Sequence, residues 1–191
     1  RRLIIDAQAE WRALDRRIAS LDEELAELAR NDPAARRLGT IPGLGIPGVT
    51  ALVAAVGDAS AFRKARDLGA PRRALRAVPS GPDRCRRHRW LGLVPRQHTT
   101  GGRPRLLGIT KRGNRYLRML LIHGARAAMK PLAASATPLG KWLRGLLARA
   151  HRPGNRGNVV LVALANKLAR IAWAVLRRQT TFAPGHGMPA G

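Results

Sequence analysis

Two adjacent hydroxyl residues, Thr99 and Thr100, stand in the part of the chain that is richest in groups able to do chemistry. Gly101 and Gly102 follow directly, and glycine lets a backbone adopt positive φ or approach a partner closely. A hydroxyl can attack a phosphodiester when a base takes its proton and cations stabilise the charge that develops. The pattern therefore indicates a hydroxyl presented to a polyanion, with these candidate phosphate-binding residues: Arg96, Arg103, Arg105, Lys111, Arg112, Arg115 and Arg118.

Two further residues close to this segment could take part in such chemistry. His98 could accept the proton of the attacking hydroxyl, although a histidine in such a place is more often just a polar loop residue. Tyr116 is the only tyrosine and a competing nucleophile, but its place in a predicted helix favours a packing role.

The order of short motifs around the threonines resembles the C-terminal domain of the DEDD-type insertion-sequence transposases, the family of bridge-RNA-guided DNA recombinases. In that family, a nucleophilic serine stands before a glycine, so Thr100 is the matching residue and Thr99 the second candidate. Threonine is a bulkier, secondary alcohol with a restricted χ1, and this departure puts covalent attack in doubt. The matching segments are GLVPR at 92–96, TTGG at 99–102, TKRGN at 110–114 with Gly113, LR at 117–118, IPGLG at 41–45 and ANKLA at 165–169.

The resemblance covers most of residues 38–178 and implies a transposase that cleaves and rejoins DNA strands, with specificity guided by RNA. The family's acidic DEDD site lies in an N-terminal RuvC-like domain, which we expect to be absent from this chain. We therefore expect a fragment that is inactive alone, with divalent metal (Mg) bound only by the absent domain and no metal or cofactor within this chain. The alternative is a non-catalytic, nucleic-acid-binding remnant of a transposase, which the threonine in place of serine favours.

The formal net charge of +25 is unevenly distributed along the chain. Eight of the eleven acidic residues precede position 33, and no carboxylate follows Asp83. Because so much unpaired positive charge repels itself, we expect a polyanion, and nucleic acid in particular, as partner. The resemblance implies that the partners are DNA and a guide RNA. With one cysteine and no run of about 18 or more uninterrupted apolar residues, we expect a cytoplasmic protein without a membrane span. The resemblance implies a bacterial protein that is nucleoid-associated when bound to DNA.

Residues 2–31 are predicted to form one long helix that Asn31, Asp32 and Pro33 terminate. Its apolar residues alternate spacings of three and four, which is typical of a coiled coil and needs a partner helix. The helix is either a dimerisation arm or a strut against another segment, and we expect a homo-oligomer formed through it. The apolar seam comprises Ile4, Ala7, Trp11, Leu14, Ile18, Leu21, Leu25 and Leu28.

A tight turn with Gly43 and Gly45 is predicted to join two helices within residues 38–57, as in a helix-hairpin-helix. Such a turn can direct backbone N–H groups to a phosphate, or it can be an ordinary helical hairpin in the core. Further helices are predicted at 115–129, where Lys130 and Pro131 end the helix, at 139–150 and at 158–178.

The sequence thus predicts an all-α chain with no strands. It consists of a coiled-coil arm at 1–32, a compact DNA-recombinase domain at 33–178 with a glycine-rich catalytic loop, and a flexible tail at 179–191. Residues 71–89 are rich in arginine and proline, which predicts a disordered basic insert or a product of frame slippage.

Overall fold

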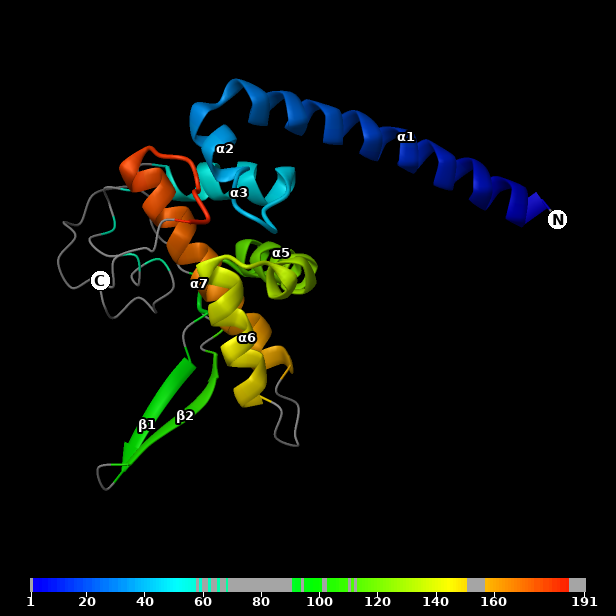
Figure 1. Ribbon diagram of the computed structural model, residues 1–191. Coiled ribbons are helices and arrows are strands. Elements are labelled where there is room, and N and C mark those ends of the chain that lie inside the picture. The colour runs from blue at the N-terminus through cyan, green and yellow to red at the C-terminus, as the bar shows by residue number, and fades with distance from the viewer. Residues whose placement is uncertain are drawn as a thin grey trace, which may run out of the picture.

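The computed structural model (Figure 1) describes residues 2–57, 59, 62, 65, 68, 91–93, 95–100, 103–109, 111, 113–150 and 157–185, and for 95–100 and 103–106 it describes the backbone alone. The predicted insert at 71–89, Gly101, Gly102, Arg112 and the end of the tail from 186 lie outside this part. The fold is mostly helical, as predicted. Its elements are α1 (Arg2–Asn31), α2 (Pro33–Leu38), α3 (Ile46–Val56), β1 (Pro95–Thr100), β2 (Arg103–Ile109), α5 (Arg115–Ala134), α6 (Pro138–Ala150) and α7 (Gly157–Arg178).

The predicted long helix is α1, which extends away from the rest of the molecule (Figure 1). None of its residues is buried, and only its last turns contact α2 and α3. Trp11, in the middle of the predicted seam, is 70% exposed. The apolar seam is therefore exposed and available to a partner helix. Packing against a partner would stabilise α1, because an isolated helix gains little stability from backbone hydrogen bonds alone.

The chain turns sharply between α1 and α2 at Asp32. The Asp32 carboxylate accepts hydrogen bonds from the backbone N–H groups of Ala34, at 2.7 Å, and Ala35, at 3.4 Å. Pro33 occupies the first turn of α2, where its missing N–H costs nothing. The end of α1 at this point is as predicted, whereas the short helix α2, which the Asp32 cap starts, was not predicted.

Helix α7 is the centre of the core and packs against α2, α5 and α6. It is long and apolar enough to span a membrane by composition, but a core helix passes the same test. Ten of its residues are buried, including Leu164, Ala165 and Leu168. The apolar side of α7 is therefore the surface on which the other helices are assembled.

Helix α5 begins where predicted and ends later than predicted. Asn114 caps its start, since the Asn114 side chain accepts a hydrogen bond from the Leu117 N–H at 3.1 Å. Pro131 does not end the helix, which continues to Ala134 with the proline inside it. The helix ends at Ser135, whose N–H and hydroxyl both donate to the Leu132 carbonyl oxygen.

The prediction of no strands is wrong for residues 95–109, which form an antiparallel two-stranded sheet of β1 and β2. The stretch expected to be a glycine-rich loop is thus a hairpin whose strands flank Gly101 and Gly102 in sequence. Figure 1 shows this hairpin projecting from the helical body on the side away from α2.

The predicted turn between α2 and α3 is pressed against α5. Gly43 has a φ of +86°, and a Cβ atom there would collide with the Gly124 carbonyl oxygen on α5. A Cβ atom on Gly124 would in turn overlap the Gly43 carbonyl oxygen. Gly43 therefore has a packing role, while Gly45 is the N-cap of α3 and makes no side-chain cap. Phosphate contact by this turn stays a prediction.

We predict that Gly124→Ala lowers the free energy of unfolding by about 1–3 kcal/mol, because the added methyl overpacks a contact between two backbones. Gly145→Ala is the matched control, since a Cβ atom at this helical glycine meets nothing within 4 Å. It should raise stability by about 0.5–1 kcal/mol. Denaturant titrations of both variants provide the measurement, and equal effects would contradict the proposed backbone contact.

Candidate functional site

The pairing of β1 with β2 sets which residues share a face of the hairpin. Thr100 pairs with Arg103 and His98 pairs with Arg105. Directly paired residues lie on the same face of a ribbon, and residues two apart along a strand return to that face. These four positions therefore form one face of the hairpin, which we call the hydroxyl–arginine face.

The opposite face of the hairpin has a different character. Gln97 pairs with Leu106, and Thr99 pairs with Pro104. The two adjacent threonines are therefore separated by the pleat of the strand, and only Thr100 shares a face with the arginine positions. Arg96 lies at an irregularity of the register between Pro95 and Gln97. A bulge at this point would re-aim the strand near its base.

The hairpin is attached to the core at residues 91–93. Leu91 is 0% exposed and Leu93 is 1% exposed, so both apolar side chains are fully buried. Two hydrogen bonds also hold the backbone of this segment. The Leu91 N–H donates to the Leu68 carbonyl oxygen, and the Lys111 N–H donates to the Gly92 carbonyl oxygen, each at 3.3 Å. Buried anchors therefore hold the hairpin at its base.

Arg118 completes this attachment from α5. Its Nη1 atom donates a hydrogen bond of 3.0 Å to the Leu91 carbonyl oxygen, across 27 residues of sequence. The bond satisfies a backbone oxygen on a fully buried residue, which would otherwise cost free energy. Arg118, predicted to bind phosphate, thus has a structural contact, and its phosphate role stays a prediction.

The remaining predicted site residues lie around the base or elsewhere. Lys111 is exposed with a φ of 55°, and Gly113 has a φ of 115°, which glycine adopts without strain. Arg115 is exposed in the first turn of α5. The structure therefore brings the Thr100, Arg103 and Arg105 positions to one face of the hairpin. Lys111, Gly113 and Arg115 follow the end of β2, where the Lys111 N–H bonds to the base of the hairpin. Gly43 and Gly45 lie apart from these residues, in the turn before α3.

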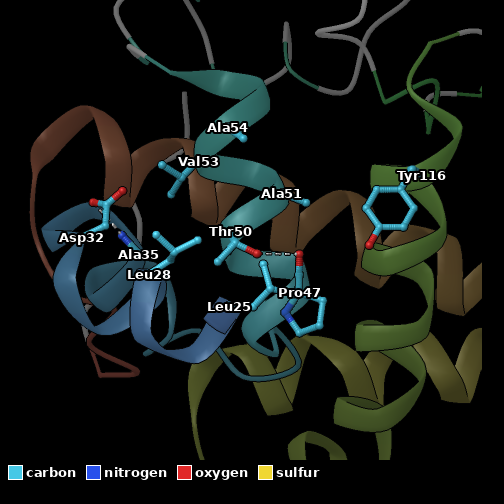
Figure 2. Close-up of a pocket in the computed structure, with 10 residues that line it drawn as sticks. All are labelled: Leu25, Leu28, Asp32, Ala35, Pro47, Thr50, Ala51, Val53, Ala54 and Tyr116. Carbon is cyan, nitrogen blue, oxygen red and sulfur yellow. Dashed lines mark hydrogen bonds between the residues drawn. The ribbon is translucent and has the colours of Figure 1, made fainter. Parts of the chain in front are cut away.

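Tyr116, the competing nucleophile, belongs to a separate region. It is 54% exposed and lines a groove of about 490 Å³ together with Leu25, Leu28, Pro47 and Ala51. Figure 2 shows the Tyr116 ring directed toward α3, with the α1 leucines on the other side of the groove. The groove is also lined by Asp32, whose carboxylate caps α2 by accepting from the Ala34 and Ala35 N–H groups. The packing role expected for Tyr116 stays a prediction.

Positive charge dominates the part of the chain that the structure describes beyond α1. Within the described residues, the acidic side chains belong to α1 and to Asp32, and the Asp32 carboxylate is engaged as a helix cap. In the same residues, no three histidine, cysteine, aspartate or glutamate side chains come together in a way that could hold a metal ion.

These features define a mostly helical, strongly basic domain with a projecting β-hairpin, and sequence comparison identifies its family. Residues 81–137, a span that includes the hairpin and most of α5, match the model described as the Transposase IS116/IS110/IS902 family. This match places residues 81–137 in this family of transposases, as the motifs predict.

Curated relatives match nearly the whole chain. A probable family 20 transposase of Pseudomonas aeruginosa is 43% identical over 183 residues, or 96% of this chain and 47% of the relative. The transposase for insertion sequence element IS1328 of Yersinia enterocolitica is 38% identical, over 95% of this chain and 47% of the relative. The transposase for IS1111A of Coxiella burnetii is 39% identical, over 90% of this chain and 40% of the relative. The chain thus spans somewhat less than half the length of these relatives.

The hairpin has a sequence signal that the prediction of an all-α chain did not use. Two glycines between short segments are a known two-residue hairpin connection, and Gly101 and Gly102 stand in that position. The flanking segments lack the alternation of apolar residues that marks a strand on a core, because both faces of this ribbon carry polar positions. The structural role of Arg118 had no local signal, since its partner lies 27 residues away.

We predict that Arg118→Met lowers the free energy of unfolding by about 1–3 kcal/mol, because the buried Leu91 carbonyl oxygen loses a charged donor. Arg115→Met removes the same charge one turn earlier, from an exposed side chain, and should change stability by less than about 0.5 kcal/mol. Hydrogen exchange should also show faster exchange of the hairpin amides in Arg118→Met alone. Equal exchange in the two variants would exclude Arg118 as an anchor of the hairpin.

Proposed function

We propose that this chain is the strand-transfer part of an insertion-sequence transposase, in which the Thr100 hydroxyl attacks a DNA phosphodiester. The observation that carries the proposal is the hairpin register, which puts Thr100 on the same face as Arg103 and Arg105. The family membership of the chain supplies the reaction class. DNA is the proposed substrate, and a guide RNA is the proposed source of target specificity.

The proposed step forms a bond between the Thr100 Oγ1 atom and phosphorus, and it breaks one P–O bond of the DNA backbone. The hydroxyl proton goes to a base, and His98, on the same face, is the candidate. The departing deoxyribose oxygen takes up a proton. The positive charges of Arg103 and Arg105 offset the negative charge that gathers on the phosphate oxygens. Rejoining reverses these steps with a new DNA hydroxyl as the attacking group.

Thr100 lies at the far end of β1, so the site needs contacts from DNA or from another part of the transposase in addition to the hairpin. A strand of this length extends about 17 Å from its base, and a two-stranded ribbon is marginally stable in water. The hydroxyl–arginine face is therefore expected to become ordered against DNA or against another part of the transposase. Metal-dependent chemistry is assigned to that other part, which in the family carries the acidic site.

We predict that Thr100→Ala abolishes the covalent protein–DNA adduct, whereas Thr100→Ser retains or increases it, because serine is the less hindered alcohol. The chain should be tested joined in frame to the portion of the Pseudomonas aeruginosa relative that it does not match, with DNA carrying the element's ends. The adduct is measured on denaturing gels with labelled DNA. Thr99→Ala is the matched control and should leave more than about half of the adduct, since Thr99 lies on the other face.

An adduct that persists in Thr100→Ala would show that the assigned nucleophile is wrong. If DNA binds but neither the original protein nor Thr100→Ser forms an adduct, the chain is the alternative, a non-catalytic nucleic-acid-binding remnant.

We also propose that α1 joins two or more copies of the chain through its apolar seam. Leu14 and Ile18 are 55% and 56% exposed, although both lie on the side of α1 that a coiled coil would bury. Helix α1 carries seven acidic residues and five arginines, so its net charge is slightly negative and DNA would bind the basic domain in preference to this helix.

We predict that the double variant Leu14→Lys, Ile18→Lys is monomeric, whereas the original chain sediments as an oligomer. Ala13→Lys with Ser20→Lys adds the same charge on the opposite side of α1 and should leave the oligomer intact. Analytical ultracentrifugation gives the masses. A monomeric original chain would rule out assembly through the seam.

A further inference from the structure

A row of polar residues on α7 lies outside the hairpin and has no role in the chemistry proposed above. Lys167, Arg170 and Trp173 follow one another at spacings of three, so they run along one side of the helix. All three side chains are partly buried, in contrast to the fully buried residues on the core side of α7. We call these three residues the α7 row.

The charges of the α7 row are not neutralised within the part of the chain that the structure describes. The Lys167 ammonium lies over the ring of Trp142 on α6, at 5.7 Å from the ring centroid. Burial lowers the pKa of Lys167 below its usual value of 10.5, and the positive charge of Arg170 lowers it further. Two cations thus lie close together in a partly buried position, with an aromatic face and no carboxylate as their described surroundings.

Two hydrogen-bond donors of the same region are also unsatisfied. Arg170 Nε and Trp173 Nε1 are buried and have no hydrogen-bond partner within the described part of the chain. The same holds for Arg37 Nε on α2, a helix that packs against α7. The segment after α7 returns to the turn that follows α2, where the Phe182 N–H donates to the Thr40 hydroxyl at 2.9 Å. The last turns of α7 therefore lie near α2. Buried donors normally have a partner, so three in this region need an explanation.

We propose that the α7 row is a second phosphate-binding site, which holds a backbone phosphate of the nucleic acid at a distance from the hairpin. A phosphate supplies what the row lacks, since it carries negative charge for Lys167 and Arg170 and several acceptor oxygens for their N–H groups. The inference adds to the proposed function and rests on different residues. It identifies α7 as part of the nucleic-acid surface as well as the centre of the core.

The ligand chemistry favours phosphate over a protein carboxylate. The described acidic residues lie on α1 and at Asp32, and the Asp32 carboxylate already caps α2. A nucleic-acid strand that enters the hydroxyl–arginine face also offers a phosphate at every nucleotide along its length. One strand, or the second strand of a duplex, can thereby contact both sites at once.

The test follows the indole N–H resonance of Trp173 in the ¹⁵N-tryptophan-labelled chain, assigned by its loss in Trp173→Phe. The additions are inorganic phosphate and, separately, a short DNA duplex, each against sodium chloride of equal ionic strength. We expect both to shift the Trp173 resonance, while the resonance of Trp11, 70% exposed on α1, stays in place. Phosphate should also raise the midpoint of thermal unfolding.

Arg170→Gln should weaken phosphate binding about tenfold. It should also reduce the slope of log DNA affinity against log salt concentration by about one, which corresponds to the loss of one phosphate contact. Arg126→Gln is the matched control, because it removes the same charge from an exposed position on α5, and it should preserve the Trp173 response. Lys167→Met should raise the unfolding midpoint at low salt without phosphate, because it removes one of two unneutralised cations, and it should lose the stabilisation by phosphate. This gain in stability is not expected of a residue with a merely structural role.

A Trp173 resonance that ignores both phosphate and bound DNA would overturn the proposal. A response to phosphate with none to DNA would overturn its assignment to nucleic acid. Thr100→Ala should keep the Trp173 response, so failure of the nucleophile and failure of the α7 row are seen separately.

Discussion

Burial of residues 91–93 is the constraint on which the candidate site depends. The two strands have their main contacts with each other, so their place on the molecule is set at the base, where Leu91 and Leu93 enter the core. Arg118 and the backbone of Lys111 hold the same segment by hydrogen bonds. If this base moved, the hydroxyl–arginine face would have no fixed relation to the helices.

The helical body provides a rigid support for this base through α5 and α7. Gly124 allows the turn at Gly43 to lie directly on α5, and the apolar side of α7 packs against α5 along the core. Helix α5 therefore contacts the turn, α7 and, through Arg118, the hairpin. Small residues in the core, the buried side chains of Leu91 and Leu93, and hydrogen bonds at the base thereby connect the core to the projecting hairpin.

Charge divides the molecule in the same way as the packing does. The described acids belong to α1 and Asp32, while the hairpin and helices α5 to α7 carry cations. A basic domain of this kind is stabilised when a polyanion lowers its self-repulsion. Two of the three buried donors without a partner in the described part of the chain, Arg37 Nε and Arg170 Nε, belong to such cations.

The sequence predicted most of the helices because each has a local cause. Asp32 and Asn114 are N-caps, and the apolar spacing of α7 marks its buried side. It did not predict the hairpin, since polar residues on both faces hide the alternation of a strand, nor the continuation of α5 through Pro131. For the site, the family motif indicated Thr100, but its placement opposite Arg103 depends on the register of the strands. The contact of Arg118 with Leu91 joins residues 27 positions apart.

The most direct test of the central claim is to identify the residue that carries DNA. The covalent adduct would be trapped, digested with protease and nuclease, and sequenced by mass spectrometry. The account predicts a nucleotide attached to Thr100. A nucleotide on Thr99 or Tyr116, or on a residue outside the hairpin, would contradict it.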